Sequence, residues 1–185
     1  MGRDKALLPH PEGGCWLERT LALLAAQGMP VTLLSRHGEH RQRAQALALR
    51  HGLAIEALDE PPPWEGPLPA LARLMDHHPH QRLLLCPVDM PGLTAAALQE
   101  LRAAADAAGG AIVVAHDGER LQPLLGVYPS GDTQRHQLAT ALANGERRLQ
   151  RWLASQPHRT VPLASAALRN LNHPADWELF RNTQP

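Results

Sequence analysis

The chain has 185 residues, and its 18 lysines and arginines are balanced by 18 aspartates and glutamates. This balance excludes the general electrostatic attraction that holds basic proteins on nucleic acids or anionic membranes, so an anionic ligand must be met by a local group of residues. The longest apolar runs, Leu21–Ala26 among them, are far shorter than the roughly 20 residues that a membrane helix needs. Cys15 and Cys86 form neither a disulfide framework nor a zinc motif. We therefore expect a single cytoplasmic domain covering residues 1–185.

Predicted strands and helices alternate along the chain. Short β-branched or leucine-rich runs predict strands, and amphipathic stretches with few glycines or prolines predict helices. This alternation favours an α/β fold around a mostly parallel central sheet. In chain order the expected elements are helix Trp16–Gln27, strand Val31–Ser35, helix Glu39–His51, strand Leu53–Ala57, helix Leu68–His77, strand Arg82–Cys86, helix Thr94–Ala108, strands Ala111–Ala115 and Leu124–Tyr128, helices Thr133–Ala143 and Arg147–Ala154, and strand Arg159–Pro162.

Two segments carry particularly clear local signals. Leu17, Leu21 and Leu24 recur at helical spacing and predict the buried face of the first helix. Gly28 is typical of a helix end. The run at 60–67, Glu-Pro-Pro-Pro-Trp-Glu-Gly-Pro, contains too much proline for a helix or a central strand. A stiff loop of this kind, placed directly after a strand, is suited to form one wall of a ligand cleft.

An aspartate follows the most apolar of the expected strands. Asp89 lies between Pro87 and Pro91, just beyond the run Leu83–Cys86. Ligands of open α/β sheets bind beyond the carboxyl ends of the strands, and Mg²⁺ commonly takes only one or two protein carboxylates. Asp89 is therefore a candidate Mg²⁺ ligand. From the motif alone, an equally good explanation is that Asp89 caps the helix expected to begin near Thr94.

Two further charged sites lie earlier in the chain. Lys5 follows Asp4 at the start, where a solvated terminus is the simpler explanation. Asp59 comes after the second expected strand, on what should be the same edge of the sheet as Asp89. Its carboxylate could accept hydrogen bonds from a base or a ribose hydroxyl, or it could merely form a turn with Glu60 and Pro61.

Several other polar segments have ordinary structural explanations. The run His116–Arg120 contains Asp-Gly and predicts a hairpin turn. The histidines within His77–His80 are better explained as a polar connection between a helix and a strand than as a metal site. Gly145 should end one helix, and Arg147 and Arg148 after it are either surface charges or a bidentate phosphate clamp. Near the end of the chain, the sequence predicts a final helix after residue 172, capped by Asn172 or His173.

Taken in order, these segments resemble the MobA family of molybdenum cofactor guanylyltransferases. Residues 1–8 are similar to the end of the family's Arg-Met-Gly-x-Asp-Lys pattern, and Asp59 matches the acid ahead of its Gly-Pro-Leu segment, here 66–68. Residues 85–91 resemble its Cys-x-x-Asp-x-Pro metal motif. Three more segments match in the same order, 116–120, 145–148 and 170–174, so that the resemblance covers nearly the whole chain.

The resemblance implies a three-layer Rossmann-like nucleotidyltransferase fold and a Mg²⁺-dependent enzyme. Such an enzyme transfers GMP from GTP to the terminal phosphate of molybdopterin and releases pyrophosphate. It would work with molybdoenzymes or their chaperones, and with neither nucleic acid nor membranes. The alternatives are a molybdopterin cytidylyltransferase and a non-catalytic remnant that binds the pterin. The residues that the resemblance assigns are Lys5, Asp59 and Asp89 to the nucleotide, Lys5 and Asp89 to catalysis, Asp89 to the metal, and Arg147, Arg148 and Asn172 to the pterin.

The sequence departs from the family at its start. The family pattern begins with a strand and a Leu-x-Gly-Gly-x-Ser-x-Arg loop, whose backbone N–H groups cradle phosphates, and the sequence from Met1 onward contains neither. We expect Met1 to be an internal methionine of a longer protein whose start has been assigned too late. Translating the in-frame codons upstream of Met1 tests this expectation, because a stop codon directly upstream would contradict it.

Overall fold

The structure is a computed structural model that describes residues 4–10 and 13–170. The chain forms two compact units, each assembled from segments that are separated in the sequence. Of the described residues, the first unit takes those up to 59, the segment 88–96 and those from 165 to 170, and the second unit takes 60–87 and 97–164.

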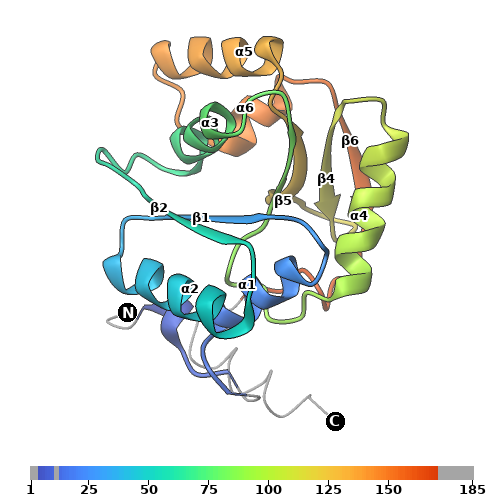
Figure 1. The fold of residues 1–185 in the computed structure, drawn as a ribbon. Coiled ribbons are helices and arrows are strands. Elements are labelled where there is room, and N and C mark those ends of the chain that lie inside the picture. The colour runs from blue at the N-terminus through green and yellow to red at the C-terminus, as the bar shows by residue number, and fades with distance from the viewer. Residues whose placement is uncertain (1–3, 11–12, 171–185) are drawn as a thin grey trace. The chain divides into compact units, whose positions relative to one another are not determined.

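The first unit contains two parallel strands with two helices on one side of them (Figure 1). A short 3₁₀ turn, η1 (Lys5–Leu7), precedes α1 (Trp16–Ala25), β1 (Val31–Ser35), α2 (Gly38–His51) and β2 (Ile55–Asp59). The register pairs Val31 with Ile55 at one end and Ser35 with Asp59 at the other. The carboxyl ends of β1 and β2 therefore lie side by side.

The apolar face predicted for the first helix builds the core of this unit. Leu17 and Leu21 are buried and Leu24 packs against them, together with Val31 and Ala44. The helix ends at Ala25, and the backbone of Gly28 has a φ of +74°, a conformation that a side chain would strain. The predicted helix end is confirmed.

The second unit is built on a four-stranded sheet in the order β3-β5-β4-β6. Its strands are β3 (Arg82–Leu85), β4 (Ile112–His116), β5 (Leu121–Pro129) and β6 (His158–Pro162). β5 runs antiparallel to both β3 and β4, and β4 runs parallel to β6, so three of the four strands share one direction. The exception has a local cause, because the turn between β4 and β5 is too short for the crossover that a parallel pair requires.

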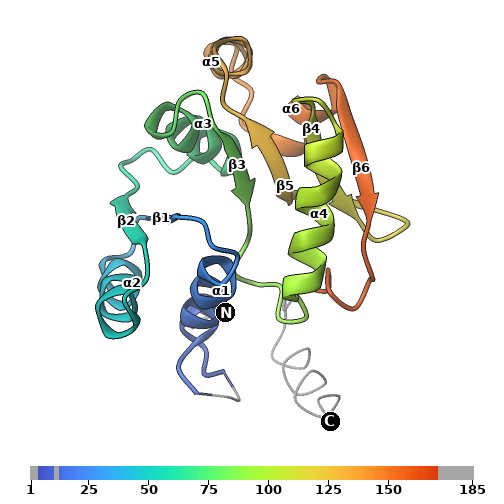
Figure 2. The same ribbon diagram turned by 45° about the vertical axis from the view of Figure 1, so that its right-hand side comes forward.

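Helices cover both faces of this sheet. Ile112 and Val114 of β4 pack in one cluster with residues of α3 (Pro67–His77), α5 (Asp132–Ala143) and α6 (Leu149–Ala154). The alternate residues Val113 and Ala115 are also fully buried and point to the opposite face. There α4 (Ala95–Ala107) crosses the strands, with α6 behind them (Figure 2). The second unit therefore has three layers, and the α/β fold class is confirmed.

The elements expected between residues 16 and 162 are present, with small shifts at their ends. β2 ends at Asp59, two residues later than expected, because it stays paired with β1 up to Ser35. β5 begins at Leu121 because the preceding segment closes a tight hairpin. In that hairpin the Asp117 carboxylate accepts from the backbone N–H groups of Glu119 and Arg120, at 2.9 and 2.7 Å. These bonds hold the pKa of Asp117 below its usual range.

Two expectations about composition can also be compared with the structure. Cys15 and Cys86 are free thiols, as expected. Across the described part of the chain, none of the helices has the length and apolar character needed to span a membrane.

Candidate functional site

Asp89 lies in the first unit, on the irregular segment between β3 and α4. Helix α4 begins at Ala95, so its N-cap position is Thr94, well beyond Asp89 in the chain. The segment turns between the two, where the Leu93 N–H donates to the Met90 carbonyl at 3.2 Å. Asp89 is therefore not the cap of α4, and the alternative explanation of Asp89 as a helix cap is wrong.

The Asp89 carboxyl is half-buried, and Lys5 is the cation that acts on it. Burial raises the pKa of Asp89 because it disfavours the charged form, and the positive charge of Lys5 opposes that rise to a smaller extent. The structure thus brings together two of the residues predicted for nucleotide binding. A partly desolvated carboxylate is an oxygen donor whose charge calls for a cation, which fits Mg²⁺.

Lys5 belongs to an ordered turn. The Asp4 carboxylate accepts from the Ala6 N–H at 3.0 Å and caps η1, and the Leu8 N–H donates to the Lys5 carbonyl at 3.2 Å. Ala6 is buried against the core of the unit. From Asp4 onward the segment is therefore hydrogen-bonded, rather than the solvated end that the sequence suggested.

Asp59 is the last residue of β2 and is held by an arginine. Nη1 of Arg41 lies 2.6 Å from the Asp59 carboxylate and also donates to the Ser35 carbonyl at 2.7 Å. This contact replaces the turn with Glu60 and Pro61 that the sequence left open. The Asp59 side chain remains two-thirds exposed at the end of the strand pair, so one face of the carboxylate is accessible to a ligand.

The second unit contains a cleft of about 720 Å³ between the start of α3 and the start of α6. Its walls include the end of the proline-rich loop, as the sequence predicted. Within that loop the Trp64 indole N–H donates to the Glu60 carbonyl at 2.8 Å, and Arg73 lies 3.3 Å from the Glu60 carboxylate. The contact between Glu60 and Arg73 thus fixes the loop to α3. The residues that line the cleft are Glu65, Gly66, Pro67, Arg147, Arg148, Leu149, Gln150, Arg151 and Ala154.

The two arginines predicted as a phosphate clamp both line this cleft, but they differ in their bonding. Arg147 is largely engaged: its Nε contacts Glu65 at 2.5 Å, and its Nη1 donates to the carbonyls of Leu142 and Glu146 at 2.8 and 2.9 Å. Arg148 is exposed. Its backbone N–H, like that of Arg147, donates to the Glu146 carboxylate, and these bonds lower the pKa of Glu146.

Asn172, the third residue predicted on the pterin side, lies outside the described residues, as does the expected final helix.

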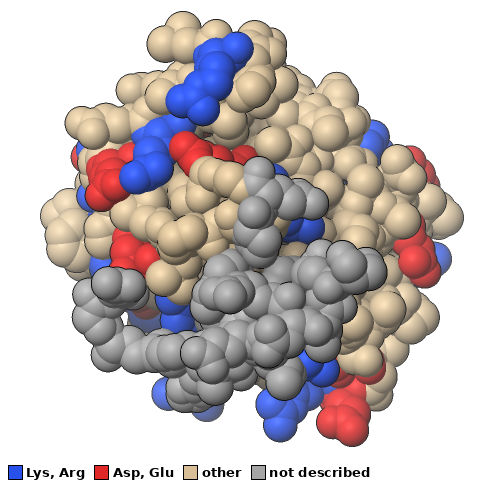
Figure 3. All heavy atoms as spheres, turned by 90° about the horizontal axis from the view of Figure 1, so that it is seen from below, with Lys and Arg blue, Asp and Glu red and all other residues tan. Residues whose placement is uncertain are grey.

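Charges on the surface are mixed: on the face drawn in Figure 3, acidic and basic side chains lie interspersed among neutral ones. This mixture agrees with the balanced composition.

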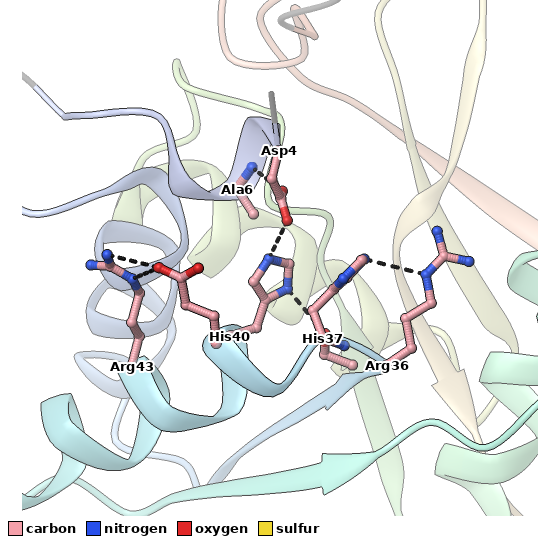
Figure 4. Close-up of polar contacts among 8 residues, drawn as sticks. Asp4, Ala6, Arg36, His37, His40 and Arg43 are labelled. Carbon is pink, nitrogen blue, oxygen red and sulfur yellow. Dashed lines mark hydrogen bonds and ion pairs between the residues drawn. The ribbon is translucent and has the colours of Figure 1, made fainter. Parts of the chain in front are cut away.

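Sequence reasoning missed a polar group that surrounds the predicted nucleotide residues. His40 and Ser35 are buried. His40 contacts both the Ser35 hydroxyl and the Asp4 carboxylate, and Figure 4 shows His40 pointing toward Asp4. Arg41 holds Asp59. The signal that could have found His40 is its position on the buried face of α2 with Ala44 and Leu47. A histidine on an apolar stripe must find partners elsewhere in the fold.

Comparison with known proteins agrees with this architecture. The family profile of the MobA-like NTP transferase domain matches residues 1–161. The chain belongs to this family. Among related proteins, a probable molybdenum cofactor guanylyltransferase of Rhodopirellula baltica is 35% identical over 184 residues, which cover 95% of this chain and 83% of the relative. Another probable molybdenum cofactor guanylyltransferase, from Synechococcus elongatus, is 32% identical over 186 residues, which cover 98% of this chain and 91% of the relative.

Solved structures show that the MobA-like chain has a nucleotidyltransferase fold. Molybdopterin-guanine dinucleotide biosynthesis protein A of Archaeoglobus fulgidus aligns with a TM-score of 0.69 at 16% identity, over 96% of this chain and 89% of that one. A 2-C-methyl-D-erythritol 4-phosphate cytidylyltransferase of Thermus thermophilus aligns with a TM-score of 0.68 at 18% identity, over 95% and 91%. As a member of the MobA-like family, the chain is a nucleotidyltransferase.

Proposed function

We propose that this MobA-like enzyme transfers GMP from GTP to the terminal phosphate of molybdopterin, forming the guanine dinucleotide cofactor and releasing pyrophosphate. The observation that carries the proposal is the half-buried Asp89 carboxylate, on which the charge of Lys5 acts, in the segment that resembles the family's metal motif. Relatives described as probable molybdenum cofactor guanylyltransferases support the choice of substrates.

The reaction needs alignment and charge neutralisation more than it needs a protein nucleophile. An oxygen of the pterin phosphate forms a bond to the α-phosphorus of GTP while the bond from that phosphorus to the bridging oxygen breaks, and the electron pair leaves with pyrophosphate. The attacking oxygen is already anionic, so no serine, cysteine or strong general base is required. What remains for the protein is to hold the reacting groups in line and to offset their crowded negative charge.

Three residues of the first unit are proposed for the nucleotide. Lys5 contacts the phosphates, Asp59 binds the guanine nucleotide, and Asp89 holds Mg²⁺. The bound ion would supply positive charge to the phosphate oxygens. Support for these roles comes from the charge of Lys5 acting on the half-buried Asp89 carboxyl and from the exposed carboxylate of Asp59 at the carboxyl end of β2.

The arginines of the second unit are proposed for the acceptor. Arg148 is exposed on the wall of the cleft, where its guanidinium can take a phosphate group. Arg147 shapes that wall through its bonds to Glu65 and to the carbonyls around it. Asn172 is retained on the pterin side from the resemblance.

A direct assay tests the proposal. Purified protein is supplied with Mg²⁺, molybdopterin and either GTP or CTP, and both pyrophosphate and the dinucleotide product are measured. Faster turnover with GTP is expected. Preference for CTP would make the chain a molybdopterin cytidylyltransferase instead, and pterin binding with turnover of neither nucleotide would identify a non-catalytic remnant. Asp89→Ala should abolish transfer while preserving the circular dichroism of the folded protein.

A further inference from the structure

A chain of hydrogen bonds runs through the first unit beside the turn that carries Lys5 (Figure 4). Nε2 of His40 lies 2.7 Å from one carboxylate oxygen of Asp4, and Nδ1 of His40 lies 3.0 Å from the Ser35 hydroxyl oxygen. The His37 backbone N–H donates to the same hydroxyl oxygen at 3.2 Å. Three elements thereby meet at one imidazole: η1, the end of β1 and the first turn of α2.

His40 is placed by the buried face of α2. It is 8% exposed and lies on the same stripe as Ala44 and Leu47, and Ser35 is 6% exposed. A buried imidazole is stable only when its ring nitrogens have partners. Both nitrogens have one: Nε2 donates to the Asp4 carboxylate, which as an ionised group can only accept, and Nδ1 is hydrogen-bonded to the Ser35 hydroxyl.

Asp4 is fixed at both of its carboxylate oxygens. Oδ1 accepts from the Ala6 N–H at 3.0 Å, and Oδ2 accepts from His40. The first bond shapes η1, and the second ties it to α2. Lys5 is the first residue of that turn, so the position of its backbone depends on where Asp4 is held.

The serine, histidine and aspartate in this chain of bonds are those of a hydrolytic triad, but their arrangement does not suit hydrolysis. Ser35 is buried at the end of β1, and its hydroxyl oxygen is occupied by the His37 N–H. A nucleophile must reach a substrate carbonyl. The Ser35 hydroxyl instead serves to hold the imidazole in one orientation, which leaves a positioning role for the group.

We propose that His40 is a positioning residue for nucleotidyl transfer: by holding Asp4, it fixes the η1 turn that carries Lys5. The inference rests on the proposed function, in which Lys5 contacts the phosphates of the nucleotide. His40 itself touches no substrate. Its contribution passes through Asp4 to Lys5.

Substitutions at His40 test the link. His40→Leu removes both ring bonds, whereas His40→Gln keeps an amide N–H that can donate to Asp4 in place of Nε2. Because a hydrogen bond to a charged group typically contributes enough to change an equilibrium by roughly tenfold or more, His40→Leu should raise the KM for GTP about tenfold, and His40→Gln should restore most of it. His51→Leu is the matched control, since His51 lies on the same helix and is exposed.

A double-mutant cycle separates positioning from general destabilisation. If His40 acts through Lys5, then His40→Leu should have little further effect on kcat/KM once Lys5→Ala is present. Additive losses would overturn the proposal. Should His40→Leu fail to fold, Asp4→Ala breaks the same link from the other side and leaves the buried ring in place. Unchanged KM in Asp4→Ala would equally overturn the proposal.

Hydrogen exchange gives a readout that does not depend on activity. The amides of Ala6, Leu7 and Leu8 are bonded within η1, and they should exchange at least tenfold faster in His40→Leu, while amides in the middle of α2 keep their protection and His40→Gln restores most of the protection in η1. Unchanged exchange in η1 would refute the positioning role even if the enzyme transfers GMP. Conversely, loss of protection in η1 together with a Lys5→Ala variant of normal kcat/KM would refute the role of Lys5 in the proposed function.

Discussion

Asp89 illustrates how burial can prepare a carboxylate for a metal ion. The side chain is half-buried, and desolvation raises its pKa despite the nearby Lys5. In the free enzyme the ionised form is therefore less favourable than it would be in water. In the proposed function a bound divalent cation would reverse that preference, because the positive ion stabilises the ionised carboxylate.

Asp89→Asn should separate function from stability. The amide keeps the size of the side chain but cannot replace a carboxylate as a Mg²⁺ ligand, so GMP transfer should fall by at least a hundredfold. The free energy of unfolding at pH 7, measured by urea denaturation without Mg²⁺, should stay the same or rise, because the substitution removes a charge that burial disfavours. A marked loss of stability would show that the carboxylate serves the fold instead.

The raised pKa of Asp89 also predicts the effect of pH. Metal binding requires the carboxylate form, so kcat/KM at fixed Mg²⁺ should fall as the pH drops through that raised pKa, and additional Mg²⁺ should move the fall to lower pH. The contribution of Asp89 to the free energy of unfolding changes with pH in the opposite direction to kcat/KM. The folded protein holds the proton more tightly than the unfolded chain does, so this contribution is present at low pH and is lost as the pH rises through the folded pKa. Asp89→Asn should remove both effects.

The first turn of α2 connects separate parts of the first unit. His40 holds Asp4, and the next residue, Arg41, holds Asp59 while also donating to the Ser35 carbonyl. Both His40 and Arg41 also bond to Ser35, the last residue of β1. One helical turn therefore fixes the surroundings of two residues proposed for the nucleotide.

Arg41→Ala should release Asp59 and weaken nucleotide binding. The ion pair is partly exposed, so its loss should lower the free energy of unfolding by only about 1 kcal/mol. KM for GTP should rise several-fold, with a smaller effect on kcat, because the Asp59 carboxylate would no longer be held in one orientation. Steady-state kinetics and thermal unfolding measure the two effects. Arg43→Ala removes the ion pairs of Arg43 with Glu39 and Glu18 but leaves the contact between Arg41 and Asp59 in place; this variant is the control and should leave KM unchanged.

The start of α6 should respond differently to substitution of its two arginines. Arg148→Ala removes an exposed charge from the cleft, so KM for molybdopterin should rise about tenfold with almost no change in the unfolding midpoint. Arg147→Ala also removes the contact with Glu65 and two bonds to carbonyls, so it should lower stability by about 1 kcal/mol as well. If Arg148→Ala leaves acceptor kinetics unaltered, the acceptor binds elsewhere.

Each of the two units has an apolar cluster of its own. In the second unit Leu71 of α3 is 1% exposed within the cluster that spans the sheet and its covering helices. In the first unit Leu17 and Leu21 of α1 pack against β1 and α2. In a densely packed core, the loss of even one or two methyl groups lowers stability. Substitution of these leucines should therefore change stability more than substitution of surface residues.

Leu71→Ala should lower the free energy of unfolding by about 2–5 kcal/mol, because it leaves a cavity among helices and strands that cannot close fully. Leu49→Ala on α2 is the matched control: that side chain is 86% exposed, and its loss should change stability by less than about 0.5 kcal/mol. Denaturant unfolding of both variants provides the comparison. Equal effects would mean that Leu71 does not lie in a packed core.

The local pattern of the chain was enough to predict its elements. Helix and strand periodicity, Gly28 and the Asp-Gly of the β4–β5 turn act over a few residues, so they can be recognised without knowing the fold. The resemblance of short motifs likewise pointed to Lys5, Asp59 and Asp89. The α/β class and the family followed from these signals, and both are confirmed.

Contacts between distant segments could not be obtained in this way. His40 meets Asp4 across 36 positions of sequence, and the charge of Lys5, near the start of the sequence, acts on Asp89 in the distant segment 88–96. The sequence also does not reveal that Arg147 is bonded to Glu65 and to nearby carbonyls, or that Arg148 is exposed. Such pairings depend on how strands and helices pack, because packing alone decides which side chains lose water and which partners then satisfy them.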